Sequence, residues 1–121
     1  MSLTVQTEQR DEMVVVSVAG ELDMATAPQL QDQISDLLEK GRTRLVFDLS
    51  EVSFCDSTGL SVFVRAKNST DDAGGTVRLA APQRGVLRIL EVSGLVEVLR
   101  TYPTVDEAVT CLLYTSPSPR D

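Results

Sequence analysis

A short polar stretch, Val52–Leu60 (VSFCDSTGL), holds the side chains in this sequence that are best suited to chemistry or recognition. Asp56, Ser57 and Thr58 place a carboxylate and two hydroxyls in consecutive positions. These residue types are favoured at a helix start, where their oxygens accept hydrogen bonds from free backbone N–H groups. Gly59 has no side chain, so a bound partner can approach its backbone closely. The stretch therefore predicts either a capped helix or a hydroxyl-bearing recognition site.

A nucleophilic enzyme is disfavoured because the chain offers no general base. It contains no histidine, which excludes Ser-His-Asp and Cys-His catalysis and any His-ligated zinc site. Lys67 lies about three helical turns beyond Ser57, and Lys40 ends another element. Two cysteines are too few for a four-thiolate zinc site. We therefore expect neither an enzyme nor a metal site.

The segments that must position this stretch alternate between strand and helix patterns. The expected strands are Leu3–Thr7, Met13–Ala19, Arg44–Leu49, Thr76–Ala80 and Leu95–Leu99. The expected helices begin near Ala27, Ser57, Arg84 and Thr104, and the second runs to about Asn68; Ser50–Asp56 and Asp71–Gly75 are expected loops. Alternating strands and helices predict an α/β domain with a mostly parallel sheet of about five strands and crossover helices. The first two strands are joined too tightly for a crossover, so we expect them to be antiparallel.

Two helix starts carry the same capping pattern. Thr26 with Gln29, and Thr104 with Glu107, are spaced as in a capping box. Gly41 is a natural residue to follow the end of the first helix. The helix that begins at Ser57 follows the carboxyl end of a strand, which is the edge of an open α/β sheet where ligands usually bind.

Cys55 borders the start of that helix, a position that lowers a thiol pKa and suits a redox sensor. A lone cysteine at a strand end is more often a small buried apolar side chain, and we favour that interpretation.

Composition and charge limit the class of partner. The chain has 121 residues, 42% of them hydrophobic, which matches one globular domain. Eighteen acidic and 11 basic residues leave a net charge of −7, so nucleic acid and anionic membrane are poor partners. No run approaches the roughly 20 apolar residues of a membrane span, and Met1–Arg10 does not resemble a signal peptide. We expect a cytoplasmic protein.

The last eleven residues, Cys111–Asp121 (CLLYTSPSPRD), differ in composition from the rest. They look like the translation of a common transposase sequencing adapter. The alternative is a disordered Pro/Ser tail. We predict a native domain over residues 1–110, a non-native tail over residues 111–121, and a last helix that is interrupted near Thr110.

The motif residues resemble those of the STAS domain, and more narrowly those of the bacterial anti-sigma factor antagonists. The resemblance rests on D-S-T-G-L after an L-V-F-D-L-S strand, and on the G-E-L-D segment that ends at Asp23. It covers about Leu3–Thr110. It implies a STAS-type fold.

The resemblance implies a phosphorylation switch at Ser57. In that family, the partner anti-sigma factor is a serine kinase that uses its own bound ATP, so the antagonist needs no cofactor. The unphosphorylated antagonist binds the anti-sigma factor and frees the sigma factor; phosphorylation breaks the complex, and a phosphatase restores it. The implied partner surface maps onto Asp23, Asp56, Ser57, Thr58 and Gly59. Thr58 is the competing phosphate acceptor, although we expect its hydroxyl to cap the helix.

Two other functions remain open from the sequence. One is a STAS docking subunit of a transport or stress-sensing complex that lacks a phosphorylation switch. The other is a module that binds a small ligand or a nucleotide.

Overall fold

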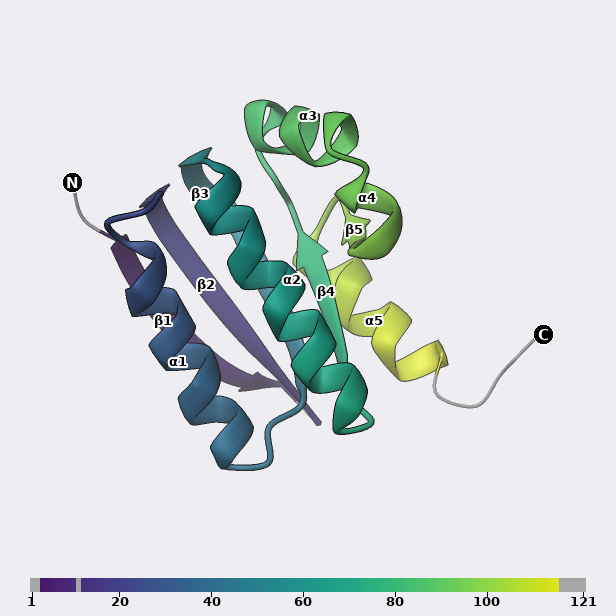
Figure 1. Cartoon of the computed structure of the whole chain (residues 1–121). Helices are drawn as coiled ribbons and strands as arrows, with labels where there is room; N and C mark the ends of the chain where they lie inside the picture. Colours follow the sequence, from purple (N-terminus) through teal and green to yellow (C-terminus); the bar gives the residue numbers. More distant parts are fainter. Residues whose placement is uncertain (1–2, 11, 116–121) are drawn as a thin grey trace.

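A five-stranded mixed sheet forms the centre of the structure, a computed structural model that describes residues 3–10 and 12–115 (Figure 1). In spatial order the strands are β1 (Leu3–Arg10), β2 (Met13–Leu22), β3 (Arg44–Cys55), β4 (Thr76–Ala80) and β5 (Arg100–Tyr102). β1 pairs antiparallel with β2, and each later neighbour pairs in parallel. The predicted α/β architecture, with its antiparallel first pair, is confirmed.

Helices cover both faces of the sheet. They are α1 (Ala27–Glu39), α2 (Ser57–Asp72), α3 (Arg84–Val92), α4 (Leu95–Val98) and α5 (Val105–Thr115). α1 and α2 lie side by side over one face, and the buried residues of α3 join the same core (Figure 1). α5 packs on the opposite face, against β3, β4 and β5. None of the described helices is long and apolar enough to cross a lipid bilayer.

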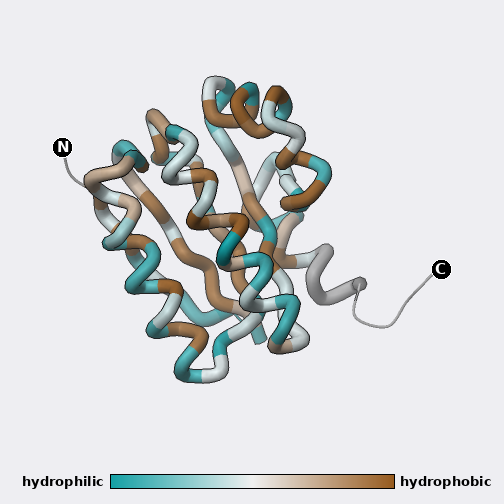
Figure 2. The backbone as a smooth tube through the Cα atoms, in the orientation of Figure 1, coloured by the Kyte–Doolittle hydropathy of each residue, from teal (hydrophilic) through white to brown (hydrophobic). Residues whose placement is uncertain are grey.

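The main core lies between the sheet and the α1–α3 layer. Hydrophobic colours follow the central strands, and the helices alternate between hydrophobic and hydrophilic turns (Figure 2). Leu30 and Ile34 of α1 are fully buried. Phe47 of β3 meets Phe63 of α2 edge-on, with ring centroids 5.1 Å apart and an interplanar angle of 64°. Edge-to-face aromatic pairs of this kind fix how a helix sits on its strand.

β3 is longer than predicted. Ser50–Asp56 was expected to be a loop, but the strand continues to Cys55. Its outer half pairs with the end of β2 across two register shifts, and Gly20 takes φ +116° at the second of them. Bulges of this kind keep a ladder going while they bend the strand. The partner strand, and not the local residue types, therefore sets where β3 ends.

Several other observed boundaries differ from the predicted ones. β1, β2 and α2 each continue three or four residues beyond their predicted ends, to Arg10, Leu22 and Asp72. The predicted strand Leu95–Leu99 is wrong: this segment forms α4, and the strand follows it as β5. A short apolar run fits a buried helical turn or a buried strand equally well, so its pattern does not decide between them.

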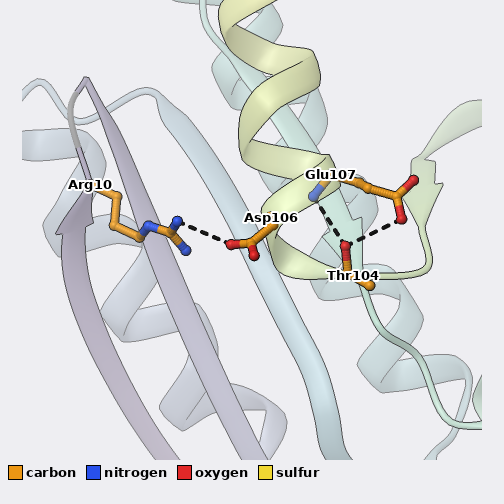
Figure 3. A network of polar contacts seen from close by, with 4 residues as sticks. All are labelled: Arg10, Thr104, Asp106 and Glu107. Atoms are coloured by element: carbon orange, nitrogen blue, oxygen red, sulfur yellow. Dashed lines mark hydrogen bonds and ion pairs between the residues drawn. The ribbon is translucent and has the colours of Figure 1, made fainter.

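The two capping predictions had different outcomes. At α5, the Glu107 N–H donates to Thr104 Oγ1 over 3.1 Å, as predicted, and Arg10 pairs with the neighbouring Asp106 (Figure 3). At α1, the predicted pair is wrong. Thr26 makes no side-chain cap to that helix, and Gln29 donates to the carbonyl of Leu3 instead.

α5 extends to Thr115, past Thr110 where we expected the helix to be interrupted. No glycine or proline occurs before Pro117 in this part of the sequence, so the backbone is free to continue the helix. Residues 116–121 of the predicted tail lie outside the described residues. That residues 111–121 are non-native stays a prediction.

Candidate functional site

The start of α2 is built by Asp56. This residue is extended, with φ −99° and ψ −173°, and its Oδ1 accepts the N–H of Gly59 over 3.0 Å. Its own N–H donates to the carbonyl of Leu22 over 3.1 Å, which ties the end of β3 to the end of β2. Asp56 therefore caps α2 and also joins the two loops that carry the predicted site residues.

Ser57 and Thr58 are the first two residues of α2, and both are exposed. Within the described part of the chain, neither hydroxyl makes a hydrogen bond. The expectation that the Thr58 hydroxyl caps the helix is therefore wrong. The capping hydrogen bond is made by Asp56 instead, whose carboxylate accepts the N–H of Gly59. The backbone N–H groups of these first two positions have no partner within the helix. Free N–H groups at a helix start favour a negative charge nearby.

Gly59 is buried, and the structure supplies a packing reason for a glycine there. An added Cβ would lie 2.7 Å from Leu22 Cγ, 2.9 Å from Cys55 Sγ and 3.0 Å from the carbonyl oxygen of Leu22. The glycine therefore lets α2 start close against the end of β2. The prediction that a partner approaches its backbone stays a prediction.

Cys55 is buried and free, which confirms the interpretation as a small apolar side chain. Burial, and to a smaller extent the negative charge of Asp56, together raise the pKa of its thiol to about 12. These effects outweigh the lowering that a helix start would produce, so the thiol is protonated and unreactive at neutral pH.

Asp23 lies in the turn between β2 and α1, where it is half-buried. Its Oδ1 accepts the N–H groups of Ala25 and Thr26, at 3.0 and 3.1 Å. In return, the Asp23 N–H donates to Thr26 Oγ1 over 2.9 Å. This reciprocal pair, Asp23 with Thr26, lies three residues earlier in the chain than the predicted pair, Thr26 with Gln29. The exposed Met24 lies between Asp23 and Thr26.

Two open grooves flank Ser57. One, of about 390 Å³, lies between α1 and α2 and is lined by residues that include Met24, Gln31, Ser57, Thr58 and Arg65. The other, of about 470 Å³, lies between α2 and the α3–α4 region, and Ser57 and Arg65 line it too. Sequence reasoning missed Met24, which only the tertiary fold brings to Ser57. It also missed Arg65, which the spacing Ser57, Ser61, Arg65 along α2 could have placed on the same side of that helix.

The predicted site residues are thus brought to one edge of the sheet. Asp56, Ser57, Thr58 and Gly59 open α2, and the turn that contains Asp23 is joined to them by the bond between Asp56 and Leu22. Asp23 makes hydrogen bonds within its turn, and Gly59 allows α2 to start close to β2. The hydroxyls of Ser57 and Thr58 make no hydrogen bond to the described residues.

Known proteins are similar to this chain in sequence and in fold. Residues 4–108 match the model of the STAS domain family. The chain is 32% identical to the anti-sigma-B factor antagonist of Bacillus subtilis over 82% of this chain and 90% of that protein.

Two solved structures have the same fold. An anti-sigma factor antagonist from Mycobacterium paratuberculosis superposes with a TM-score of 0.83 at 33% identity, over 93% of this chain and 95% of that one. The phosphorylated form of the Bacillus cell fate determinant SpoIIAA superposes with a TM-score of 0.70 at 25% identity, over 89% and 98% of the two chains. The family match over nearly all described residues, together with these relatives, shows that the chain belongs to the STAS domain family.

Proposed function

We propose that this protein is an anti-sigma factor antagonist whose binding is controlled by phosphorylation of Ser57. The unphosphorylated protein binds an anti-sigma factor and thereby frees a sigma factor. The observation that carries the proposal is the exposed, unbonded hydroxyl of Ser57 at the start of α2, in a chain similar to antagonists over most of its length. In this proposal the protein acts by binding.

The phosphate comes from ATP bound to the anti-sigma factor, which acts as a serine kinase. The γ-phosphoryl group passes to Ser57 Oγ, the hydroxyl proton leaves, and ADP is the second product. Ser57 is accessible for this transfer, and the N–H groups at the start of α2 favour the new anion. A separate phosphatase reverses the step. The partners are proteins of the cytoplasm, and neither nucleic acid nor a membrane takes part.

Phosphorylation releases the partner because the added negative charge weakens binding at this contact. The phosphate adds about −1.5 to −2 charges at pH 7 beside Asp56, in a contact that had accommodated a neutral hydroxyl. Burying an unpaired charge in a docked interface costs roughly 2–5 kcal/mol, which corresponds to about 30-fold to several-thousand-fold in affinity. The fold tolerates the group because it stands at a helix start, on an exposed residue.

Intact-mass analysis tests the proposed chemistry. The protein is incubated with Mg-ATP and a candidate anti-sigma kinase, with Ser57→Ala and Thr58→Ala beside the wild type. We expect one phosphate on the wild type and on Thr58→Ala, and none on Ser57→Ala. A phosphate that persists on Ser57→Ala but not on Thr58→Ala would move the acceptor to Thr58. A stable complex that yields no phosphate would instead favour a constitutive docking subunit.

A further inference from the structure

Three residues of α2 form the ridge between the two grooves that flank Ser57. Ser57, Ser61 and Arg65 line both grooves, whereas every other described lining residue borders only one of them. The three follow one another at intervals of four residues, which places them along one side of the helix. Ser57 and Arg65 therefore border the same two spaces, although eight positions separate them in the chain.

Arg65 has no competing partner in the described part of the chain. Its side chain is exposed, and it makes no hydrogen bond or ion pair with the described residues. By contrast, Lys67 lies two residues further along α2 and is bound to Asp71 over 2.5 Å. Arg65 is also the only cation among the described lining residues of the two grooves. A guanidinium in this state offers a planar set of donors that fits a phosphate.

The geometry of α2 lets Arg65 reach a phosphate on Ser57. Eight residues rise about 12 Å along an α-helix. Helical side chains lean toward the amino terminus, which directs Arg65 back over Ser61. Ser61 is small, and its hydroxyl already donates to the carbonyl of Ser57 over 3.0 Å, so the path along the ridge is open. An extended arginine side chain and a phosphoserine side chain are together long enough to meet across this rise.

The other charges near Ser57 are negative. Asp56 precedes it in the chain, Asp32 of α1 lines the groove between α1 and α2, and the turn that contains Asp23 is joined to Asp56 through Leu22. The groove toward α3 and α4 adds no other charged side chain among its described lining residues. Negative neighbours raise the second pKa of a phosphate, which is about 6 for an ordinary phosphoserine. A cation beside the phosphate acts in the opposite direction.

We propose that Arg65 holds the phosphate on Ser57: its guanidinium donates hydrogen bonds to the phosphate oxygens across Ser61 and keeps the modified serine doubly charged at neutral pH. This inference rests on the proposed function and adds the residue of this chain that receives the modification. The pair belongs to the free phosphorylated protein, where Arg65 is exposed. Free energy that the pair contributes to the free protein and not to the complex favours release of the anti-sigma factor, as the proposed function requires.

An NMR titration of the phosphate tests the inference. Residue 57 is introduced as phosphoserine during translation, so that no kinase is needed, and the second pKa of the phosphate is followed through its phosphorus chemical shift. The phosphoprotein with an otherwise unchanged sequence is compared with Arg65→Gln, Arg65→Lys and Arg100→Gln. Thermal unfolding of each variant checks that it folds.

Arg100 is the matched control. It is also an exposed arginine without an ion pair among the described residues, and its loss changes the net charge by the same amount. It opens β5 and lies in register with Arg78 of β4, which lies in register with Val46 near the start of β3. Ser57 follows the other end of β3, so Arg100 lies at the opposite edge of the sheet.

We expect the second pKa of the phosphate to lie about one pH unit higher in Arg65→Gln, the low end of the effect of an adjacent opposite charge. Arg65→Lys is expected to fall between the two, since an ammonium keeps the charge but loses the planar donors. Arg100→Gln is expected to titrate like the unchanged phosphoprotein, because salt at about 0.15 M screens distant exposed charges. The Nε–H proton signal of Arg65 is expected to shift when Ser57 carries the phosphate.

The outcomes separate this inference from the proposed function. Equal phosphate pKa values in Arg65→Gln and the unchanged phosphoprotein would overturn the inference and leave the proposed function standing. An equal rise in Arg65→Gln and Arg100→Gln would also overturn it, since the effect would then be one of net charge alone. If no anti-sigma kinase phosphorylates Ser57, the proposed function fails, whereas the titration still shows whether Arg65 holds a phosphate placed there.

Discussion

Asp56 and Ser57 are neighbours with separate roles at the start of α2. The carboxylate of Asp56 is used inside the molecule, where it caps the helix and leaves the hydroxyl of Ser57 free. The side chain of Ser61, one turn along, donates to the carbonyl of Ser57 over 3.0 Å and not to its hydroxyl. A residue that is modified reversibly has to be released from structural contacts, and Ser57 meets that condition.

Gly59 offers a direct test of the packing under Ser57. Gly59→Ala is expected to cost about 1–3 kcal/mol, because the new Cβ would lie within 3.0 Å of Leu22 and Cys55 and the backbone has to shift. Urea unfolding measures the free energy of unfolding. The matched control is Gly85→Ala in α3, where an added Cβ meets nothing within 4 Å. That variant is expected to gain about 0.5–1 kcal/mol from helix propensity. Two equal effects would contradict the packing argument.

The raised pKa of the Cys55 thiol predicts that the free energy of unfolding depends on pH. Its thiol pKa is raised to about 12 in the folded protein, from 9.0 for an ordinary thiol, by burial and by the charge of Asp56. Above pH 9 the unfolded chain loses this proton and the folded protein keeps it, so the free energy of unfolding falls as pH rises toward 12. We expect Cys55→Ala to show a shallower decline over that range. An identical decline in both proteins would contradict the assignment.

At the scale of elements, the β2–α1 turn decides how Met24 and Asp23 are presented. Thr26→Val keeps the shape of the buried side chain but removes the partner of the Asp23 N–H and of the Glu21 carbonyl. We expect it to lower the free energy of unfolding by about 1–3 kcal/mol, the cost of leaving buried polar groups unpaired. The exposed Thr7→Val is the control and is expected to stay within about 0.5 kcal/mol. Equal stabilities would show that the turn does not depend on this pair.

Sequence patterns predicted the elements whose signals are local. Thr76–Ala80 and Arg84–Val92 match the observed β4 and α3 residue for residue, because apolar spacing and flanking breakers mark both segments. The end of β3 could not be predicted, because it depends on a distant partner, the bulged end of β2. The start of α1 at Ala27 was predicted, but its capping bonds were not: the fold pairs Thr26 with Asp23 instead of with Gln29.

The candidate site was predictable in part. The motif located Asp56, Ser57, Thr58 and Gly59 at a strand end, and the structure places them there. The contribution of Met24 was not predictable, since nothing in its neighbours shows that a methionine in this turn stays exposed. Exposure of that side chain follows from tertiary packing alone.

At the scale of the whole molecule, the site and the second helical layer lie apart. α5 packs against β3, β4 and β5 on the face opposite α1 and α2, and the Arg10–Asp106 ion pair links its start to β1 (Figures 1 and 3). Under the proposed switch, a phosphate on Ser57 would change the charge of the surface around it without touching the smaller core beneath α5. Such a switch would alter what the protein binds and leave the fold intact.

The most direct test of this account measures sigma-factor release. A preformed complex of labelled sigma factor and anti-sigma factor is titrated with the unphosphorylated protein, and separately with protein that carries one phosphate on Ser57, and release is followed by fluorescence anisotropy. The account predicts release by the unphosphorylated protein, and a midpoint at least about 30-fold higher for the phosphorylated protein. Equal release by both forms, or release by neither, would contradict it.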